Sequence, residues 1–198
     1  TKGKKKLRDC ENIFCFDIET SNGYIKNNVV EGWDYNKART EEAPGIFYFD
    51  NTTPVSLMYV WQCAVEHDDT IDVIMGRTWE DFKQFLLELT DTITLRAYKW
   101  DSATLQEPMR SNILKQCHKK GYIGLHMYIH NLGFEFQHLR NVFEEAFSRS
   151  EHSVFARSTR KPMKVSIGYN YCNLTFHDTL CLTQKSLANW CKDSNLPV

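Results

Sequence analysis

Apolar residues recur along the chain in short runs that predict several β-strands. The run from Ile13 to Glu19 is typical of a buried strand, and two carboxylates stand at its end. Two further runs, Val55–Glu66 and Thr70–Met75, flank an acidic turn and predict a β-hairpin. The same patterns predict four more strands, at residues 122–129, 153–157, 163–169 and 172–178.

Between these runs, apolar residues at helical spacing predict amphipathic helices. The first helix follows Thr78, which can cap it, with an aspartate at the position of the acid in a capping box. A second helix is expected over residues 108–119, after a stretch from residue 92 that predicts a strand or a loop. A third helix follows Gly133, and a final helix begins near Gln184.

This order of elements predicts a mixed α/β chain that forms a single domain over residues 1–198. Residues 1–9 are interpreted as a solvated basic leader. Residues 21–53 show no sustained period, so they are expected to form an insertion or a long loop.

The composition supports this picture and excludes several classes of protein. The 198 residues are 42% hydrophobic, include 9 Gly and 5 Pro, and carry a formal net charge of -1. Disordered chains have fewer apolar residues and a larger net charge, and collagen-like chains have far more Gly and Pro. The sequence also has no run of about 20 apolar residues that would span a membrane. The seven cysteines are odd in number and never spaced as Cys-x-x-Cys, so we expect free thiols in a reducing, cytoplasmic compartment.

The two carboxylates at the end of the first strand are the first candidates for chemistry. Asp17 and Glu19 are two residues apart, and side chains two apart on a strand point to the same face. Like charges held side by side repel each other, and hard divalent ions such as Mg²⁺ or Mn²⁺ relieve this repulsion by binding carboxylate oxygens. The alternative is a strand that runs out into solvent, where acids are common.

Two further segments place polar residues where an apolar strand ends. The sequence Tyr-Ile-His-Asn-Leu-Gly-Phe-Glu at 128–135 ends in an acid, and Leu-Thr-Phe-His-Asp-Thr-Leu at 174–180 ends another apolar strand. Turns from strand to helix lie at the edge of a sheet, where the active sites of α/β proteins are found. The three segments can therefore meet in one cleft.

Together these segments resemble motifs of the 3′–5′ exonuclease domain of family B DNA polymerases, in particular the protein-primed branch of bacteriophages and linear plasmids. The sequence Phe-Asp-Ile-Glu-Thr at 16–20 resembles the first exonuclease motif, and 128–135 resembles the second. The segment 176–180 is similar to the aromatic-x-Asp-Ser/Thr-Leu sequence that follows in the protein-primed branch. Order and spacing agree over most of the chain, apart from insertions at 21–53 and about 95–120.

The resemblance implies a ribonuclease H-like fold, a mixed sheet flanked by helices of the DEDD exonuclease type, with a two-metal phosphodiesterase site. Asp17, Glu19 and Glu135 would be the catalytic residues and the ligands of two Mg²⁺ or Mn²⁺ ions. In that arrangement Asp17 bridges the ions and Glu19 orients the attacking water. The implied substrate is the 3′ end of single-stranded DNA.

The resemblance also implies contacts to the DNA strand. Three residues match positions that hold the 3′ end: Thr20, Asn131 and Phe134. Four more match positions that line the path of the strand: Tyr128, His130, Thr179 and Leu180. Stacking on aromatic faces accepts any base, as proofreading requires.

Two departures from the family pattern bear on activity. The second motif of the family carries Asp where this chain has Glu135, which is one methylene longer, and metal ligation is sensitive to such shifts. The third motif, Tyr-x-x-x-Asp on a late helix, is absent, as is a catalytic lysine expected shortly before it. The prediction is a C-terminally truncated fragment of a longer polymerase that lacks one carboxylate ligand.

Structural roles compete with functional ones at several positions. Asn131 can cap the following helix or stabilise the turn at Gly133. Asp178 can be a buried acid hydrogen-bonded to the backbone, and it is left out of the catalytic set. His126 and His130 are four residues apart, but this spacing suits zinc only on a helix, and the segment is predicted to be a strand.

Three functions stand as hypotheses. The first is the proofreading exonuclease of a protein-primed DNA polymerase, joined to a polymerase domain, with single-stranded DNA as partner and the host cytoplasm as compartment if the polymerase is viral. The second is a non-catalytic module that binds single-stranded DNA or the terminal protein that primes replication, with a decayed metal site. The third is a stand-alone ribonuclease H-like nuclease that acts on RNA.

Overall fold

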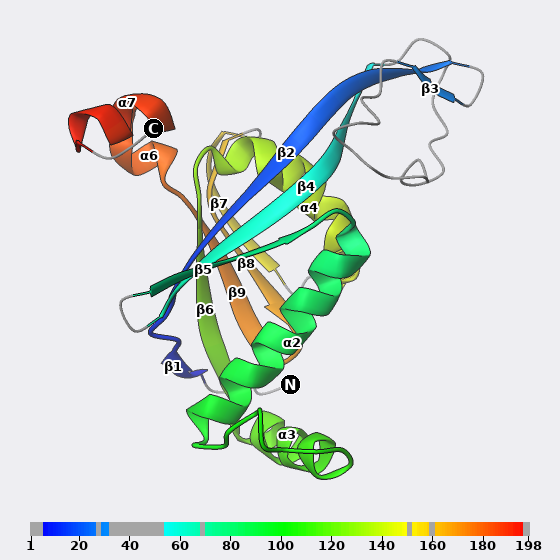
Figure 1. Cartoon of the computed structure of the whole chain (residues 1–198), viewed down its shortest axis with the longest axis vertical. Coiled ribbons are helices and arrows are strands. Elements are labelled where there is room, and N and C mark those ends of the chain that lie inside the picture. Colours follow the sequence, from blue (N-terminus) through cyan, green and yellow to red (C-terminus); the bar gives the residue numbers. More distant parts are fainter. Residues whose placement is uncertain are drawn as a thin grey trace.

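The computed structural model describes residues 6–26, 29–31, 54–67, 70–149, 152–158 and 161–195, and its strands form one nine-stranded sheet (Figure 1). In chain order the strands are β1 Lys6–Asp9, β2 Ile13–Lys26, β3 Val29–Glu31, β4 Pro54–His67, β5 Thr70–Gly76, β6 Tyr122–Ile129, β7 His152–Ser158, β8 Lys161–Tyr169 and β9 Cys172–Asp178. The main path of the sheet is β5-β4-β2-β6-β9-β8-β7, with β1 beside β6 and β3 beside β2.

The centre of the sheet is parallel and its two flanks are antiparallel. Strands β2, β6 and β9 run side by side in the same direction. The predicted hairpin of β4 and β5 lies on one flank, and β8 and β7 follow on the other. The sequence-based prediction of a mixed sheet flanked by helices in an α/β chain is confirmed.

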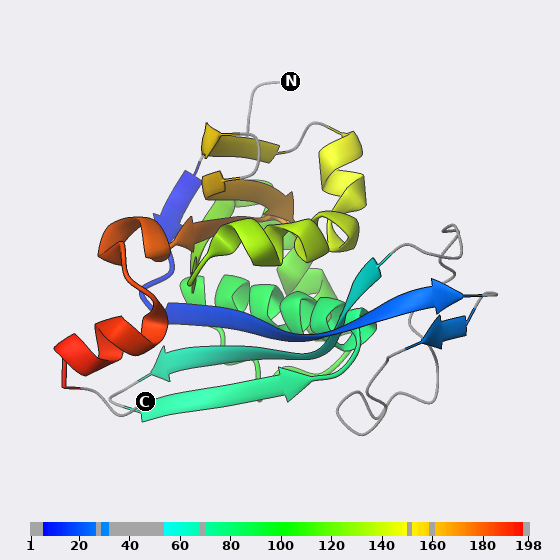
Figure 2. The same ribbon diagram turned by 90° about the horizontal axis from the view of Figure 1, so that it is seen from above.

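The helices are α2 Trp79–Ala97, α3 Met109–Lys120, α4 Leu132–Val142, α5 Glu144–Ser148, α6 Leu180–Thr183 and α7 Leu187–Asp193. Side chains of α2, α4 and α5 share one apolar core with a face of the sheet, whereas α6 and α7 bury no residue. Figure 2 shows α6 and α7 projecting away from the layer formed by the other helices. None of the described helices is both long and apolar enough to cross a membrane.

Alternation along β2 explains how an apolar strand can carry carboxylates. Phe14, Phe16 and Ile18 are buried in the core, where the ring centroids of Phe16 and Phe82 lie 4.8 Å apart. Because successive side chains on a strand point to opposite faces, Asp17 lies on the face away from these residues. The apolar positions thus fix which side of the strand the acid occupies.

The start of α2 confirms the predicted capping box. Thr78 Oγ1 accepts a hydrogen bond from the Asp81 N–H at 3.1 Å, and the Asp81 carboxylate accepts one from the Thr78 N–H at 3.2 Å. The prediction of a strand or loop from residue 92 is wrong for its first part, because α2 continues to Ala97 with Ile93 and Leu95 buried. The following helix, α3, agrees with its prediction.

The ends of other elements differ from the sequence-based predictions. Residues 6–9 of the predicted basic leader form β1, because their backbone pairs in parallel with β6, while residues 1–5 lie outside the described residues. Strand β2 continues to Lys26 through antiparallel pairing with β4, although a loop was expected from residue 21. Most of the predicted insertion, residues 27–28 and 32–53, lies outside the described part.

Two predicted helices are each divided. The helix expected after Gly133 begins at Leu132 and is split into α4 and α5 at Phe143. The final helix, expected near Gln184, consists of α6 and α7 on either side of that residue. Gln184 has a φ of 53°, in the left-handed region, which ends α6 and prevents one continuous helix.

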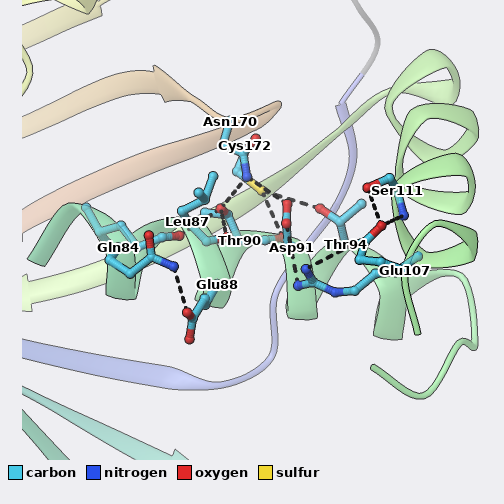
Figure 3. Close-up of polar contacts among 12 residues, drawn as sticks. Gln84, Leu87, Glu88, Thr90, Asp91, Thr94, Glu107, Ser111, Asn170 and Cys172 are labelled. Atoms are coloured by element: carbon cyan, nitrogen blue, oxygen red, sulfur yellow. Dashed lines mark hydrogen bonds and ion pairs between the residues drawn. The ribbon is translucent and has the colours of Figure 1, made fainter. Parts of the chain in front are cut away.

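A polar network ties α2 and α3 to the turn between β8 and β9 (Figure 3). The Asn170 side-chain amide donates to Thr90 Oγ1 and to an Asp91 carboxylate oxygen, both at 2.8 Å. Arg110 pairs with the Asp91 carboxylate at 3.5 Å. We call these four residues the brace. It lies at the start of β9, at the edge of the sheet opposite the ends of the parallel strands.

Candidate functional site

Two of the three segments that carry the predicted motifs end side by side, those of β6 and β9, whereas the motif at 16–20 lies within β2, which continues past them to Lys26. Strand β6 lies between β2 and β9, and all three are parallel. Tyr128 is in register with Cys15 on one side and His177 on the other, and Ile129 is in register with Asp178. The expectation that these three segments lie together is therefore confirmed for the backbone, and Figure 1 shows α4 and α6 leaving from the same end of the sheet.

Asp17 is half-buried and has a polar neighbour that the sequence did not reveal. The Gln62 side-chain amide donates to Asp17 Oδ2 at 3.2 Å, because the two residues are opposite each other in the antiparallel pairing of β2 and β4. The signal was present in principle, since Gln62 is a lone amide on a predicted strand. The hydrogen bond holds one oxygen of Asp17 in place.

Glu135 is the most deeply buried acid of the site. Its side chain is only 4% exposed, in the first turn of α4, and its Oε2 has no hydrogen-bond partner among the described residues. Burial, with a smaller contribution from the negative charges of Asp17 and Asp178, raises the pKa of Glu135 to about 8. Asp17 and Glu135 are thus electrostatic neighbours although 118 positions separate them in the sequence.

The third predicted ligand, Glu19, is exposed to solvent, next to a register shift between β2 and β4 at residues 19–20. Across the described ranges, no group of three His, Cys, Asp or Glu side chains is placed to hold a metal ion. The donors fit a hard divalent ion in kind, because Asp17 and Glu135 are carboxylates and one Glu135 oxygen is unpartnered. They are short in number, since two acids give fewer ligands than such an ion requires.

Asp178, which the sequence analysis left out of the site, lies at its centre. The carboxylate is 9% exposed and its Oδ1 accepts hydrogen bonds from the N–H groups of Asn131 at 3.1 Å, Leu132 at 3.4 Å and Leu180 at 2.9 Å. Its Oδ2 accepts from the Cys181 thiol at 3.1 Å. The interpretation of Asp178 as a buried acid bonded to backbone is confirmed, and this acid joins the turn after β6 to the turn after β9.

His130 and Thr179 form a second link between these turns. The Thr179 hydroxyl donates to the Ile129 carbonyl at 3.2 Å, so its oxygen is left to accept from His130 Nδ1–H, also at 3.2 Å. This bonding places the imidazole proton on Nδ1. His130 Nε2 then carries a lone pair, and this buried atom has no hydrogen-bond partner among the described residues.

Asn131 and Phe134 present their side chains at the start of α4. Asn131 occupies the N-cap position with a φ of 70°, but its side chain makes no capping hydrogen bond, so the capping alternative is wrong. Asparagine tolerates this left-handed conformation better than most residues do. Phe134 is 41% exposed, which excludes the core role that its apolar ring would suggest. Both side chains are available to a ligand.

The remaining predicted contacts to the DNA strand lie on three elements: Thr20 on β2, Tyr128 on β6 and Leu180 on α6. Tyr128 stacks on His177, with ring centroids 5.2 Å apart and an interplanar angle of 22°. Leu180 begins α6, and Thr20 follows the register shift in β2; both are half-buried. His177, which was not predicted, also hydrogen-bonds His126 at 2.8 Å.

Comparisons of the chain with protein-family models, with curated proteins and with solved structures found no significant match. The interpretation of the site therefore rests on its residues and their geometry.

Proposed function

We propose that the chain is a 3′–5′ exonuclease module with a ribonuclease H-like fold, which hydrolyses phosphodiester bonds at the 3′ end of single-stranded DNA. In this proposal it proofreads for a DNA polymerase of the protein-primed family B, as the motifs at 16–20, 128–135 and 176–180 suggest. Asp17 and Glu135 are the central acids, and the exposed Glu19 of β2 is the third acid of the catalytic set.

One observation supports the proposal above all others. Two acids from distant motifs, Asp17 and Glu135, lie close enough for the charge of one to raise the pKa of the other. One oxygen of Glu135 is buried without a partner, although buried polar atoms in proteins are nearly always satisfied. A divalent cation between the two carboxylates would both neutralise their repulsion and satisfy the unpartnered oxygen.

The residues around these acids divide the chemical work. Bound Mg²⁺ or Mn²⁺ would activate the attacking water and stabilise the departing 3′ oxygen. Asp17, held by Gln62, and Glu135, held on the first turn of α4, supply anchoring oxygens from two rigid elements. Phe134 offers an exposed ring to the terminal base, and the Asn131 amide can hydrogen-bond its sugar.

A second candidate function is a binding module that holds single-stranded DNA or a priming protein without hydrolysing DNA. The exposure of Glu19 and the incomplete set of metal ligands among the described residues favour it. The strand-contacting residues would serve either function, so binding alone does not separate the two.

The experiment that tests the proposal is digestion of a 5′-labelled, single-stranded oligonucleotide in the presence of Mg²⁺ or Mn²⁺. An exonuclease gives a ladder that shortens from the 3′ end, and Asp17→Ala abolishes the ladder. The Asp101→Ala variant is the control, because Asp101 is an exposed acid in a turn away from the site.

Three outcomes separate the hypotheses. A ladder from DNA but not from RNA of the same sequence supports the exonuclease, and faster cleavage of RNA supports a ribonuclease. The binding module is supported, and the exonuclease contradicted, by two results together. The chain binds the oligonucleotide tightly without producing a ladder, and any Mn²⁺ binding is the same in the wild type and in Asp17→Ala.

A further inference from the structure

Four of the seven predicted contacts to the DNA strand lie on two turns: His130 and Asn131 on the turn after β6, at residues 130–132, and Thr179 and Leu180 on the turn after β9, at residues 179–181. We call them the paired turns. Neither turn is part of the ladder of the sheet, so their relative position depends on bonds that cross between them.

Thr179 makes one set of the bonds that cross. Its N–H and its hydroxyl donate to the Ile129 carbonyl at 2.8 and 3.2 Å, and the hydroxyl oxygen contacts His130 Nδ1 at 3.2 Å.

Asp178 makes the other set. Its Oδ1 accepts two backbone N–H groups from the first turn, those of Asn131 and Leu132, and one from the second, that of Leu180. A single buried oxygen thus fixes three backbone positions on two elements. Three N–H groups that converge on one oxygen can do so in only a narrow range of relative positions, which favours one arrangement of both turns.

The hydrogen bonds of Asp178 also argue against a role as a metal ligand. With three N–H donors on Oδ1 and the Cys181 thiol on Oδ2, the carboxylate has both of its oxygens engaged by the protein. An acid whose oxygens are already committed is poorly placed to bind a cation or a water. Its effect on a ligand must pass through the groups that it holds.

We infer that Asp178 is the positioning residue of the site: its carboxylate sets the distance between the paired turns, and so the geometry with which His130, Asn131 and Thr179 hold the 3′ end of a DNA strand. The identity of the strand rests on the proposed function, whereas the positioning of the turns does not. The clearest consequence lies at His130, whose Nδ1–H bond to Thr179 joins one turn to the other without involving Asp178.

Two substitutions separate position from charge. Asp178→Asn removes the charge but keeps an oxygen where Oδ1 lies, and its amide can face the Cys181 sulfur. Asp178→Glu keeps the charge but moves the oxygens outward by one methylene. If position matters, Asp178→Asn behaves like the wild type and Asp178→Glu does not. The matched control is Asp91→Glu, which makes the same extension in the brace, at the opposite edge of the sheet.

Two readouts are measured on the full chain. The ¹⁵N chemical shifts of the His130 imidazole report whether the proton stays on Nδ1, and fluorescence anisotropy gives the Kd for a 5′-labelled oligothymidine in EDTA. We expect Asp178→Asn and Asp91→Glu to keep the Nδ1–H tautomer, with Kd within about threefold of wild type. For Asp178→Glu we expect loss of the tautomer and a Kd raised about tenfold, the equivalent of one misplaced hydrogen-bonding group.

Two results would overturn the inference. In the first, Asp178→Glu leaves the His130 shifts unchanged. In the second, Asp178→Asn disturbs them as much as Asp178→Glu does, which would show that charge rather than position matters. A wild-type chain that does not bind the oligonucleotide at all contradicts the proposed function instead. In that case the His130 shifts alone decide whether Asp178 positions the turns.

Discussion

The two ends of the parallel strands carry two clusters of buried or half-buried polar side chains that differ in how completely their hydrogen bonds are made. In the brace, Asn170 donates to Asp91, and Arg110 pairs with the same carboxylate. At the strand ends, Oε2 of Glu135 and Nε2 of His130 are buried and have no hydrogen-bond partner within the described residues. Both clusters join residues from distant parts of the chain, yet only in the brace do the polar groups named here all have partners.

Whether the polar atoms of a cluster have partners distinguishes a structural cluster from a functional one better than burial does. A satisfied polar cluster rigidifies the elements that it joins and has no remaining capacity for a ligand. A cluster with unpartnered atoms is costly to fold and persists where another molecule or ion completes it. The comparison therefore predicts opposite responses to substitution: loss of stability at the brace, and loss of activity at the strand ends.

The largest expected effect is on hydrolysis. Asp17→Asn keeps the size of the side chain but removes the charge that binds a cation, and transition-state stabilisation by a metal is worth several kcal/mol. We expect the rate of 3′-end digestion to fall about 1,000-fold. Asp91→Asn, the same change in the brace, should leave this rate within about twofold in the same assay. A fall of less than tenfold for Asp17→Asn would remove this acid from the catalytic set.

The next effect is on the dependence of stability on pH. The folded chain keeps a proton on Glu135 up to a pKa of about 8, whereas the unfolded chain releases it near 4.5. Between these values the folded state binds more protons, so the free energy of unfolding falls as pH rises from 4.5 to 8.

Glu135→Gln cannot ionise and should escape this loss. It should exceed the wild type in unfolding free energy by on the order of 3 kcal/mol at pH 8.5 and match it at pH 4. Urea denaturation at the two pH values measures the difference. Equal stability of the two chains at pH 8.5 would show that Glu135 is not held as a buried acid.

A smaller effect is expected at the brace. Asp91→Ala leaves the Asn170 amide and the Arg110 guanidinium without their shared acceptor, so we expect the free energy of unfolding to fall by about 2 kcal/mol. Strand binding should stay unchanged, because the brace lies at the other edge of the sheet. Weakened oligonucleotide binding in a folded Asp91→Ala chain would break the separation between the two clusters.

The smallest effect is on strand binding by an exposed ring. Phe134→Ala should weaken binding of an oligothymidine about tenfold, since stacking of one base contributes about 1–3 kcal/mol, with little change in stability. Trp100→Ala is the control, because Trp100 is a similarly exposed aromatic residue beyond α2. Equal losses in both variants would point to non-specific contact with the oligonucleotide.

The sequence predicted that the segments carrying the motifs lie on strands of one sheet, because strand periodicity is a strong signal. Asp17 follows apolar residues that fix its face, and the ends of adjacent parallel strands must share an edge. The sequence offered Asp178 as a buried acid bonded to the backbone, but it did not show which N–H groups it binds, since every residue but proline possesses one. The brace was equally hidden, because Asn170 and Asp91 are polar residues far apart in the sequence that follow no periodic pattern.

Errors in the fold follow the same physical logic. Helices α6 and α7 bury no residue, so their residues show none of the apolar periodicity on which prediction depends, and β1 forms through backbone pairing with β6, which leaves no such pattern. The continuation of α2 past residue 92 was obscured by three threonines, at 90, 92 and 94, because threonine favours strands and caps over helix interiors. Packing of Ile93 and Leu95 overrides that preference.

The central claim is that Asp17 and Glu135 share a bound cation, and a ¹³C NMR titration of the Glu135 carboxyl with and without Mg²⁺ tests it most directly. The account predicts a midpoint near pH 8 without the ion, a lower midpoint when Mg²⁺ is added, and loss of the Mg²⁺ effect in Asp17→Asn. A carboxyl that titrates near its ordinary pKa of 4.5 and ignores Mg²⁺ would contradict the account.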